Sequence, residues 1–323
     1  MNANIRTSGH VFRGLAWTVL LSLLIAACGT ATPLPVPEEA TDAPEIVVVT
    51  EPPTSTPTEP PAAPSKPLSG LAADPQRVEF QAEDGKNLVG YYYPSKYADA
   101  PVIILMHWAG GDLCDWKDIA RWMQNRLDEN PAKLERCEAE TRPAPWWDPT
   151  WFPAMNPDIS IAVFAFDFRD YGESESGGSW DALKLDAKAA FVAAAGFEGV
   201  DATRMASMGA SIGADGAPDG CLLYNQEAGS GCVGALSLSP GNYLGMNYAE
   251  VVTGLAPHPT WCLAAEQDGE SAPTCNSASG DHYRLQIYPG DDHGMMLIVP
   301  GLDPLPMILI QDFMELVFGE TVK

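Results

Sequence analysis

Six short apolar segments, separated by stretches of helical character, constrain the fold of this chain more than any other feature. They span residues 102–106, 159–166, 204–208, 233–238, 261–265 and 284–288. Their apolar residues run without alternation, as in strands that are covered on both faces of a parallel sheet. Residues 116–127, 180–195 and 304–318 have a helical period. We therefore expect an α/β fold with a mostly parallel central sheet and helices on both faces.

The folded domain is expected to span residues 75–323 and to begin with an antiparallel hairpin. Residues 78–82 and 88–93 alternate in polarity on either side of a turn at Asp84 and Gly85. Hydrophobic residues make up 46% of the chain, which is ample for a buried core. No internal repeat is visible.

The first 27 residues have the pattern of a signal peptide. Arg6 and Arg13 precede an apolar run over 15–27, which is shorter than the roughly 20 residues that a membrane-spanning helix needs. The run ends Ile25-Ala26-Ala27-Cys28, which resembles a bacterial lipobox. That resemblance implies cleavage before Cys28, lipidation of Cys28, and a location in the cell envelope facing outside the cytoplasm. The alternative is a plain secretory signal with an incidental cysteine.

Residues 28–74 are rich in Pro, Thr, Ala and Glu and have almost no aromatic residues. Such a segment cannot bury enough apolar surface to offset its conformational entropy. We expect a disordered, extended tether.

Six further cysteines follow Cys28, an even number, as is usual for an exported protein that forms disulfides. They fall as three neighbouring pairs along the chain. We predict disulfides that join Cys114 to Cys137, Cys221 to Cys232, and Cys262 to Cys275. A metal site is the rival interpretation, but the chain contains no Cys-x-x-Cys pair.

The formal net charge is -25. Nucleic acid and anionic lipid surfaces would repel such a chain, so neither is expected as a partner. Contact with a membrane is expected through the lipid anchor only.

The strongest chemical signal is Gly209-Ala210-Ser211-Ile212-Gly213, which follows an apolar segment and opens a helical one. A Gly-x-Ser-x-Gly sequence between a strand and a helix forms a nucleophile elbow, in which the serine has a strained backbone and an exposed oxygen. We predict that Ser211 is a nucleophile. The rival interpretation is an ordinary turn serine.

A serine needs a base to remove its proton. His293 lies in a loop just after the last apolar segment, where an imidazole can reach Ser211, and Gly294 leaves room beside the ring. His282 is the alternative base. His107 is expected to be structural and to form hydrogen bonds within its loop.

The base in turn needs a carboxylate that fixes its tautomer. Asp268 follows the strand expected at 261–265 and is our choice, with Glu266 as the fallback. Asp291 and Asp292 adjoin His293 and are too local to reach its far nitrogen. The order Ser, Asp, His along the chain is that of the α/β hydrolases.

An oxyanion intermediate needs two preorganised N–H donors. The N–H of Ile212, directly after Ser211, is expected to be the first. The second is expected in the loop after the first parallel strand, with Ala109 preferred and Trp108 as the alternative.

Four motifs in order resemble the dienelactone hydrolase-like and small esterase branch of the α/β-hydrolase superfamily. They are His107-Trp108-Ala109-Gly110-Gly111, the turn from Asp167 to Ser174, the Ser211 elbow and the His293 loop. They span nearly all of residues 75–323. In this chain His107-Trp108 stands where relatives often have His-Gly, and Asp170 stands where a glycine is usual.

Residues 127–157 are longer than a simple crossover connection needs. They carry Trp146, Trp147, Trp151 and Phe152 among prolines. They are expected to form either a lid or substrate wall, or an aromatic layer over the helices.

These observations predict a serine hydrolase that cleaves small-molecule carboxylic esters outside the cytoplasm, with no metal or organic cofactor. A peptidase or amidase of the same fold is the nearest alternative, and we rank it second because no large additional domain accompanies the fold. A surface-binding lipoprotein without activity and a structural envelope protein are further alternatives.

Overall fold

The computed structural model describes residues 67–127, 129, 134–138 and 143–319. The signal peptide expected at 1–27, the lipidation at Cys28 and most of the tether expected at 28–74 lie outside the described residues. Residues 67–74 contact the domain, since the Ser69 hydroxyl donates to the Ser95 carbonyl and Gln124 Nε2 donates to the Ala73 carbonyl. Within the described ranges, no helix combines the length and apolar character needed to cross a bilayer.

One sheet of eight strands, in the order β1-β2-β4-β3-β5-β6-β7-β8, organises the described part of the chain. The strands β1 and β2 are antiparallel, β2 is antiparallel to β4, and all other neighbours are parallel. The expected fold class is therefore confirmed. The strand bounds are β1 (Gln76–Gln81), β2 (Asn87–Tyr93), β3 (Ala100–Met106), β4 (Ala162–Asp167), β5 (Val200–Ala210), β6 (Cys232–Leu238), β7 (Thr260–Ala265) and β8 (Tyr283–Tyr288).

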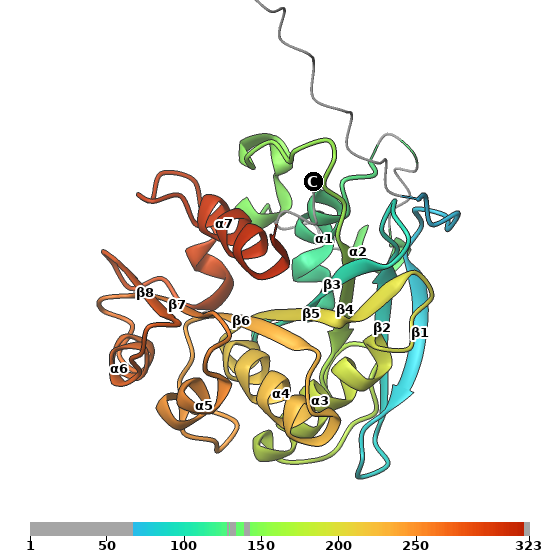
Figure 1. Cartoon of the computed structure of the whole chain (residues 1–323). Coiled ribbons are helices and arrows are strands. Elements are labelled where there is room, and N and C mark those ends of the chain that lie inside the picture. The colour runs from blue at the N-terminus through green and yellow to red at the C-terminus, as the bar shows by residue number, and fades with distance from the viewer. Residues whose placement is uncertain (1–66, 128, 130–133, 139–142, 320–323) are drawn as a thin grey trace, which may run out of the picture. The chain divides into compact units, whose positions relative to one another are not determined.

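Helices cover both faces of this sheet (Figure 1). The helices α1 and α7 lie over one face, and α3, α4 and α5 lie over the other. The helix bounds are α1 (Lys117–Gln124), α2 (Glu135–Glu138), α3 (Leu183–Ala194), α4 (Ile212–Ala228), α5 (Tyr248–Leu255), α6 (Ser271–Ser277) and α7 (Pro306–Phe318).

The central strand β3 shows why its sequence does not alternate. Ile103 and Leu105 pack into the core beneath α1 and α7, whereas Ile104 and Met106 pack into the core beneath α3 and α4. All of these side chains are fully buried. Burial of an aliphatic side chain contributes about 1.5–3 kcal/mol, so both faces of the strand require apolar residues.

The structure adds elements that the hydrophobic period did not indicate. The strand β5 begins at Val200, ahead of the expected start at 204, and α5 and α6 follow β6 and β7. The sequence of α6 has little apolar period. It is held instead by a covalent bond from Cys275 to Cys262 and by a hydrogen bond from the Tyr283 hydroxyl to the Cys275 carbonyl.

All three predicted disulfides are confirmed. Cys114 is bonded to Cys137, Cys221 to Cys232, and Cys262 to Cys275, with sequence separations of 23, 11 and 13 residues. The first pair joins the segment after β3 to α2, so it anchors the long insertion between α1 and β4. The other two each close a local loop.

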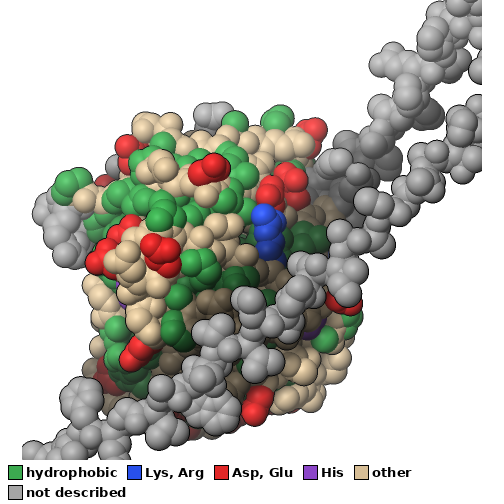
Figure 2. Space-filling view, turned by 90° about the vertical axis from the view of Figure 1, so that its left-hand side faces the viewer, with side chains coloured by type: hydrophobic (Ala, Val, Ile, Leu, Met, Phe, Trp, Pro, Cys, Tyr) green, Lys and Arg blue, Asp and Glu red, His purple; other side chains and the backbone are tan. Residues whose placement is uncertain are grey.

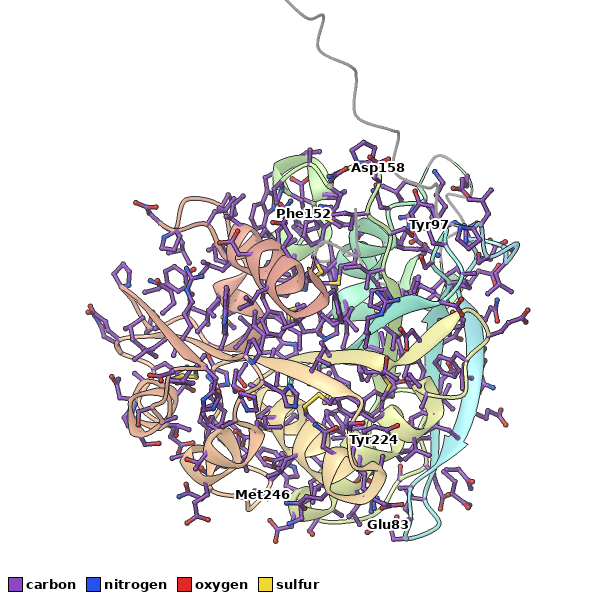
Figure 3. The ribbon with its side chains drawn as sticks, in the orientation of Figure 1. Glu83, Tyr97, Phe152, Asp158, Tyr224 and Met246 are labelled. Carbon is purple, nitrogen blue, oxygen red and sulfur yellow. A yellow bond between two sulfur atoms is a disulfide. The ribbon has the colours of Figure 1, made fainter. Side chains whose placement is uncertain are left out.

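The surface reflects the negative charge of the chain. Acidic side chains are spread over the face shown in Figure 2, and basic ones are scarce there. Several of the basic groups are engaged by carboxylates, such as Lys188, whose ammonium lies 2.6 Å from the Glu83 carboxylate. Glu83 itself lies at the turn between β1 and β2 (Figure 3).

Candidate active site

Ser211 occupies the sharp turn between β5 and α4. Its backbone has φ 54° and ψ -115°, a conformation that residues other than glycine rarely adopt. The turn is possible because both flanking glycines lack a side chain. A β-carbon on Gly209 would lie 1.9 Å from the Gly213 carbonyl oxygen, and one on Gly213 would lie 2.3 Å from the Met106 carbonyl oxygen. The expected nucleophile elbow geometry is present.

The side chains of Ser211, His293 and Asp268 form one hydrogen-bonded chain. His293 Nε2 lies 2.8 Å from Ser211 Oγ, and His293 Nδ1 lies 2.8 Å from Asp268 Oδ2. Because a carboxylate only accepts, the proton of a neutral imidazole belongs on Nδ1, and Nε2 is left to accept from the serine hydroxyl. Asp268 is nearly buried, with its side chain 9% exposed, while His293 is 31% exposed.

Two backbone contacts bring the loops after β7 and β8 together. The N–H of Glu266 donates to the Tyr288 carbonyl, and the N–H of Gln267 donates to the Gly290 carbonyl. Asp268 and His293 therefore lie on adjoining loops at the carboxyl end of the sheet. Ser211 lies at the same edge because it follows the parallel strand β5.

The glycine after His293 allows its loop to approach the nucleophile. Gly294 has φ 59°, and a β-carbon there would lie 3.2 Å from Trp108 Cε3 and 3.6 Å from Ser211 Cβ. Its N–H donates to the hydroxyl of Ser239, a buried residue that also has a positive φ, 62°. Ser239 was not assigned a role from the sequence, and it fixes the start of the 3-10 helix Gly294–Leu297.

The alternative residues named from the sequence lie in other contacts. His282 Nε2 lies 2.8 Å from the Val252 carbonyl. Glu266 is exposed, and Gln267 Nε2 donates to its carboxylate. Neither is part of the hydrogen-bonded chain that joins Ser211, His293 and Asp268.

His107 is structural, as expected. Its Nε2 accepts from the N–H of Phe168 at 3.0 Å, so its proton resides on Nδ1 and is donated to the Trp108 carbonyl at 2.8 Å. The ring is fully buried, and burial lowers its pKa, which favours the neutral form. His107 thereby ties the loop after β3 to the loop after β4.

The loop after β3 contains the two candidate oxyanion donors. The Trp108 carbonyl accepts from His107 Nδ1 and from the N–H of Gly111 at 3.2 Å. A trans peptide directs its N–H opposite to its carbonyl, so the N–H of Ala109 points away from both of these donors. Ile212 is the first residue of α4, where the N–H has no acceptor within the helix.

The turn from Asp167 to Ser174 packs against the segment that follows β3. Asp167 is fully buried, and its carboxylate accepts from the N–H groups of Leu113 and Glu173 and from Arg136. Asp170, at which the chain departs from the motif that it resembles, has φ 71°. This left-handed conformation is one that glycine adopts without strain.

A cavity of about 240 Å³ lies beside the loop after β3. Trp108, Trp146, Trp147 and Met296 line it, together with Asp115. In the described part of the insertion at 127–157, the expected aromatic packing over the helices is present, since Phe152 (Figure 3) packs edge-on against Trp122 of α1. Trp146 and Trp147 line the cavity.

Two buried acids on α4 were not identified from the sequence. Asp215 accepts from the N–H groups of Gly241 and Tyr243, and burial raises its pKa to about 6. Asp219 is one helical turn further on. Burial, and secondly the charge of Asp215, raise its pKa well above the usual value. No hydrophobic pattern reveals these residues, since they interrupt the apolar face of the helix.

Among the residues that the structure describes, no three His, Cys, Asp or Glu side chains are grouped so that they could hold a metal ion.

No protein-family model and no curated protein sequence matched the chain. Among solved structures, the chain is similar to an esterase of Pyrococcus furiosus, with 15% identity and a TM-score of 0.52 over 80% of this chain and 100% of that one. It is also similar to 2,6-dihydroxy-pseudo-oxynicotine hydrolase, with 13% identity and a TM-score of 0.52 over 77% of this chain and 69% of that one. An alpha/beta hydrolase of Penicillium sp. sh18 has 13% identity and a TM-score of 0.50, over 76% of this chain and 99% of that one.

These similarities, with the strand order and the elbow, establish that the chain has the α/β-hydrolase fold.

Proposed function

We propose that this protein is a serine hydrolase that cleaves carboxylic esters through an acyl-enzyme intermediate. The observation that carries the proposal is the chain of hydrogen bonds from Ser211 Oγ through His293 to Asp268, with both distances at 2.8 Å. The fold alone does not define an activity. Support for a reaction class comes from the site, where a nucleophile on a strained turn is aligned with a base and a carboxylate.

In the first half of the reaction, Ser211 Oγ attacks the ester carbonyl carbon while His293 Nε2 takes the hydroxyl proton. Asp268 holds the imidazole through Nδ1 and stabilises the positive charge that the imidazolium gains. The tetrahedral intermediate collapses when His293 returns its proton to the departing alcohol oxygen. In the second half, water attacks the acyl-serine by the same route and releases the acid.

The oxyanion that forms at the carbonyl requires donors placed in advance. We propose the N–H groups of Ile212 and Ala109. Support comes from the position of Ile212 at the start of α4 and from the orientation of the Trp108 carbonyl, which faces His107 and Gly111. These contacts favour Ala109 over Trp108, because the N–H of Ala109 is turned away from the interior of the loop.

The test is covalent labelling of the full chain with a fluorophosphonate, followed by peptide mass mapping. This reagent reports an activated serine beside an oxyanion hole and requires no assumption about the substrate. We expect one adduct on Ser211, and none in Ser211→Ala. Hydrolysis of 4-nitrophenyl acetate and of the matched 4-nitroanilide then separates esterase from amidase activity. A folded protein with no adduct would refute the proposal.

We also propose that the protein acts outside the cytoplasm and is held there by a lipid on Cys28. Three disulfides are typical of an oxidising compartment. Metabolic labelling with an alkynyl fatty acid should mark the wild-type chain and not Cys28→Ala. Equal labelling of both chains would refute anchoring through Cys28.

A further inference from the structure

The cavity beside the loop after β3 adjoins the proposed active site. Its lining residue Trp108 reaches the loop that holds His293, because a β-carbon on Gly294 would lie 3.2 Å from Trp108 Cε3 and 3.6 Å from Ser211 Cβ. Met296, three residues after His293, lines the same cavity. A substrate group attached to an ester carbonyl at Ser211 therefore has the cavity within reach.

The polar atoms of the cavity's three indoles are all bonded to the protein. Trp108 Nε1 donates to Asp115 at 2.7 Å, and Trp146 Nε1 donates to the other oxygen of that carboxylate at 3.2 Å. Trp147 Nε1 donates to the Cys114 carbonyl at 3.1 Å. With their N–H groups engaged, the three rings offer a ligand hydrocarbon surface and no hydrogen-bond donor.

The rings are also fixed in relation to one another. Trp146 meets both Trp108 and Trp147 edge to face, with ring centres 6.1 Å and 6.0 Å apart. Lys117 Nζ lies 4.7 Å from the centre of the Trp147 ring and donates to the Cys137 carbonyl. The cavity wall is thus held by contacts that do not involve a ligand, which reduces the entropy lost on binding.

The cavity offers an anion little to replace its hydration. The three indole N–H groups already donate to the protein, and Asp115, which is 6% exposed, adds a further acceptor to the lining. A substrate carboxylate in the cavity would lose water without gaining a donor from the three indoles, which is costly. An apolar cavity of roughly 150 Å³ can hold benzene, so the volume of about 240 Å³ accommodates a substituted ring.

We propose that this cavity binds an uncharged aromatic group of the substrate and rejects the same group when it carries a carboxylate. The proposal rests on the proposed function, since it assigns the substrate class of the same site. It makes Trp108, Trp146, Trp147 and Met296 determinants of specificity. Asp115 is a positioning residue, since it acts through the two indoles that it holds.

The experiment compares paired esters that differ only in a para-carboxylate on a phenyl ring. One pair carries the ring on the acyl side: 4-nitrophenyl phenylacetate, and the same ester with a para-carboxylate on its phenylacetyl ring. The other pair carries the ring on the alcohol side: phenethyl acetate, and the same ester with a para-carboxylate on its phenethyl ring. We expect kcat/KM for the neutral ester to exceed that for the anionic ester by at least about tenfold in one pair, a typical selectivity for pocket contacts. Equal values in both pairs would overturn the proposal.

Two variants test the assignment to this cavity. Met296 is 44% exposed, so Met296→Trp fills the cavity mouth with little risk to folding, and Trp147→Ala removes one wall. Each should lower the ratio of kcat/KM for the neutral aromatic ester to that for ethyl acetate, which carries no ring, by about five- to tenfold. Trp180→Ala is the control, since Trp180 is exposed and is not part of the lining. An unchanged ratio in Met296→Trp would refute the assignment.

Ethyl acetate, which has no ring, separates the two proposals. Hydrolysis of ethyl acetate without a preference for the neutral aromatic esters would refute the specificity proposal and leave the hydrolase intact. Absence of all hydrolysis would refute the proposed function. The cavity would then be tested by calorimetric titration with the neutral ketone 4-phenyl-2-butanone. Binding that Met296→Trp abolishes would support the aromatic site, and absence of binding would overturn it.

Discussion

The carbonyl oxygen of Gly213 lies so close to Gly209 that a β-carbon on Gly209 would approach it to 1.9 Å. The two residues flank Ser211, and their contact closes the turn from β5 into α4. The atoms that this β-carbon would meet, the carbonyl oxygen and carbon of Gly213, belong to the backbone, so no rotation of a side chain relieves the overlap. The backbone angles of Ser211 therefore depend on a glycine at position 209.

From this contact we predict that Gly209→Ala displaces Ser211 Oγ from His293 Nε2. A displacement of about 1 Å at a reacting atom costs roughly 100-fold in rate. Fluorophosphonate labelling of Ser211 should slow by at least that factor, and the melting temperature should fall. The control is Gly196→Ala, where the nearest atom to the new β-carbon, the Ala193 carbonyl oxygen, lies at 3.5 Å. Labelling of Gly209→Ala at the wild-type rate would contradict this account of the turn.

The variant Asp268→Asn tests whether Asp268 is the carboxylate that orients His293 and stabilises its protonated form. The substitution keeps the size of the side chain and removes the charge that stabilises the imidazolium. We expect kcat for ester hydrolysis to fall by about 10³–10⁴-fold, as in other triads of this type. Glu266→Gln, a change of the same kind at an exposed carboxylate two residues away, should leave kcat within a factor of about two of wild type, as expected for a substitution away from the site. Comparable losses in the two variants would show that Asp268 has no specific role.

The sequence was sufficient to place these three side chains together because each follows a parallel strand. Residues at the carboxyl ends of parallel strands meet at one edge of the sheet, so the order of Ser211, Asp268 and His293 after three apolar segments implied their proximity. The disulfides were predictable because their partners are neighbours along the chain. His107 was predictable as structural from its position within a loop.

The parts that could not be predicted depend on contacts between distant segments. Pro218 lies within α4 and cannot donate to the Ala214 carbonyl. The helix continues because the hydroxyl of Ser237, on the neighbouring strand β6, donates to that carbonyl at 2.6 Å. The carboxylate of Asp115 also depends on a distant partner, because it accepts from the indole of Trp146, 31 residues further along the chain. No local pattern encodes either pairing.

The disulfide from Cys114 to Cys137 should influence specificity, and the one from Cys221 to Cys232 should not. The carbonyl of Cys114 accepts from the Trp147 indole and the carbonyl of Cys137 accepts from Lys117, so the first disulfide supports the aromatic wall. Replacing both of its cysteines by alanine removes a covalent closure worth about 3 kcal/mol in the chain-entropy model. Loss of the second disulfide lowers stability without touching the wall.

We therefore expect Cys114→Ala/Cys137→Ala to lower the preference for the neutral aromatic ester over ethyl acetate by several-fold, roughly the value of one pocket contact. Cys221→Ala/Cys232→Ala should lower the melting temperature and keep the preference. Substrate kinetics at a temperature where both variants are folded provide the measurement. A loss of preference in both variants would indicate a general loosening and would contradict a local role.

The last prediction concerns Asp219, whose Oδ2 is buried without a hydrogen-bond partner in the described structure. Burial raises its pKa well above the usual value, with a further contribution from Asp215. In the unfolded chain an aspartate titrates near 3.9. Between that pH and the raised pKa the folded protein holds a proton that the unfolded chain has released. Stability from this residue is therefore greatest at low pH and is lost as the pH rises.

Asp219→Asn should remove this dependence, because an amide is uncharged at every pH. The charge of Lys184 favours the ionised form of Asp219 and opposes the effect only in part. We expect the variant to match wild type near pH 3, below the unfolded pKa, and to be more stable at pH 8 by more than about 1 kcal/mol, which corresponds to a melting temperature about 2–4 °C higher. Calorimetric scans at both pH values measure the difference. Asp312→Asn, at an exposed position on α7, is the matched control. It should leave the melting temperature unchanged at both pH values. If Asp219→Asn is no more stable than wild type at pH 8, the prediction is wrong, because the charged carboxylate of Asp219 then carries no cost in the folded protein.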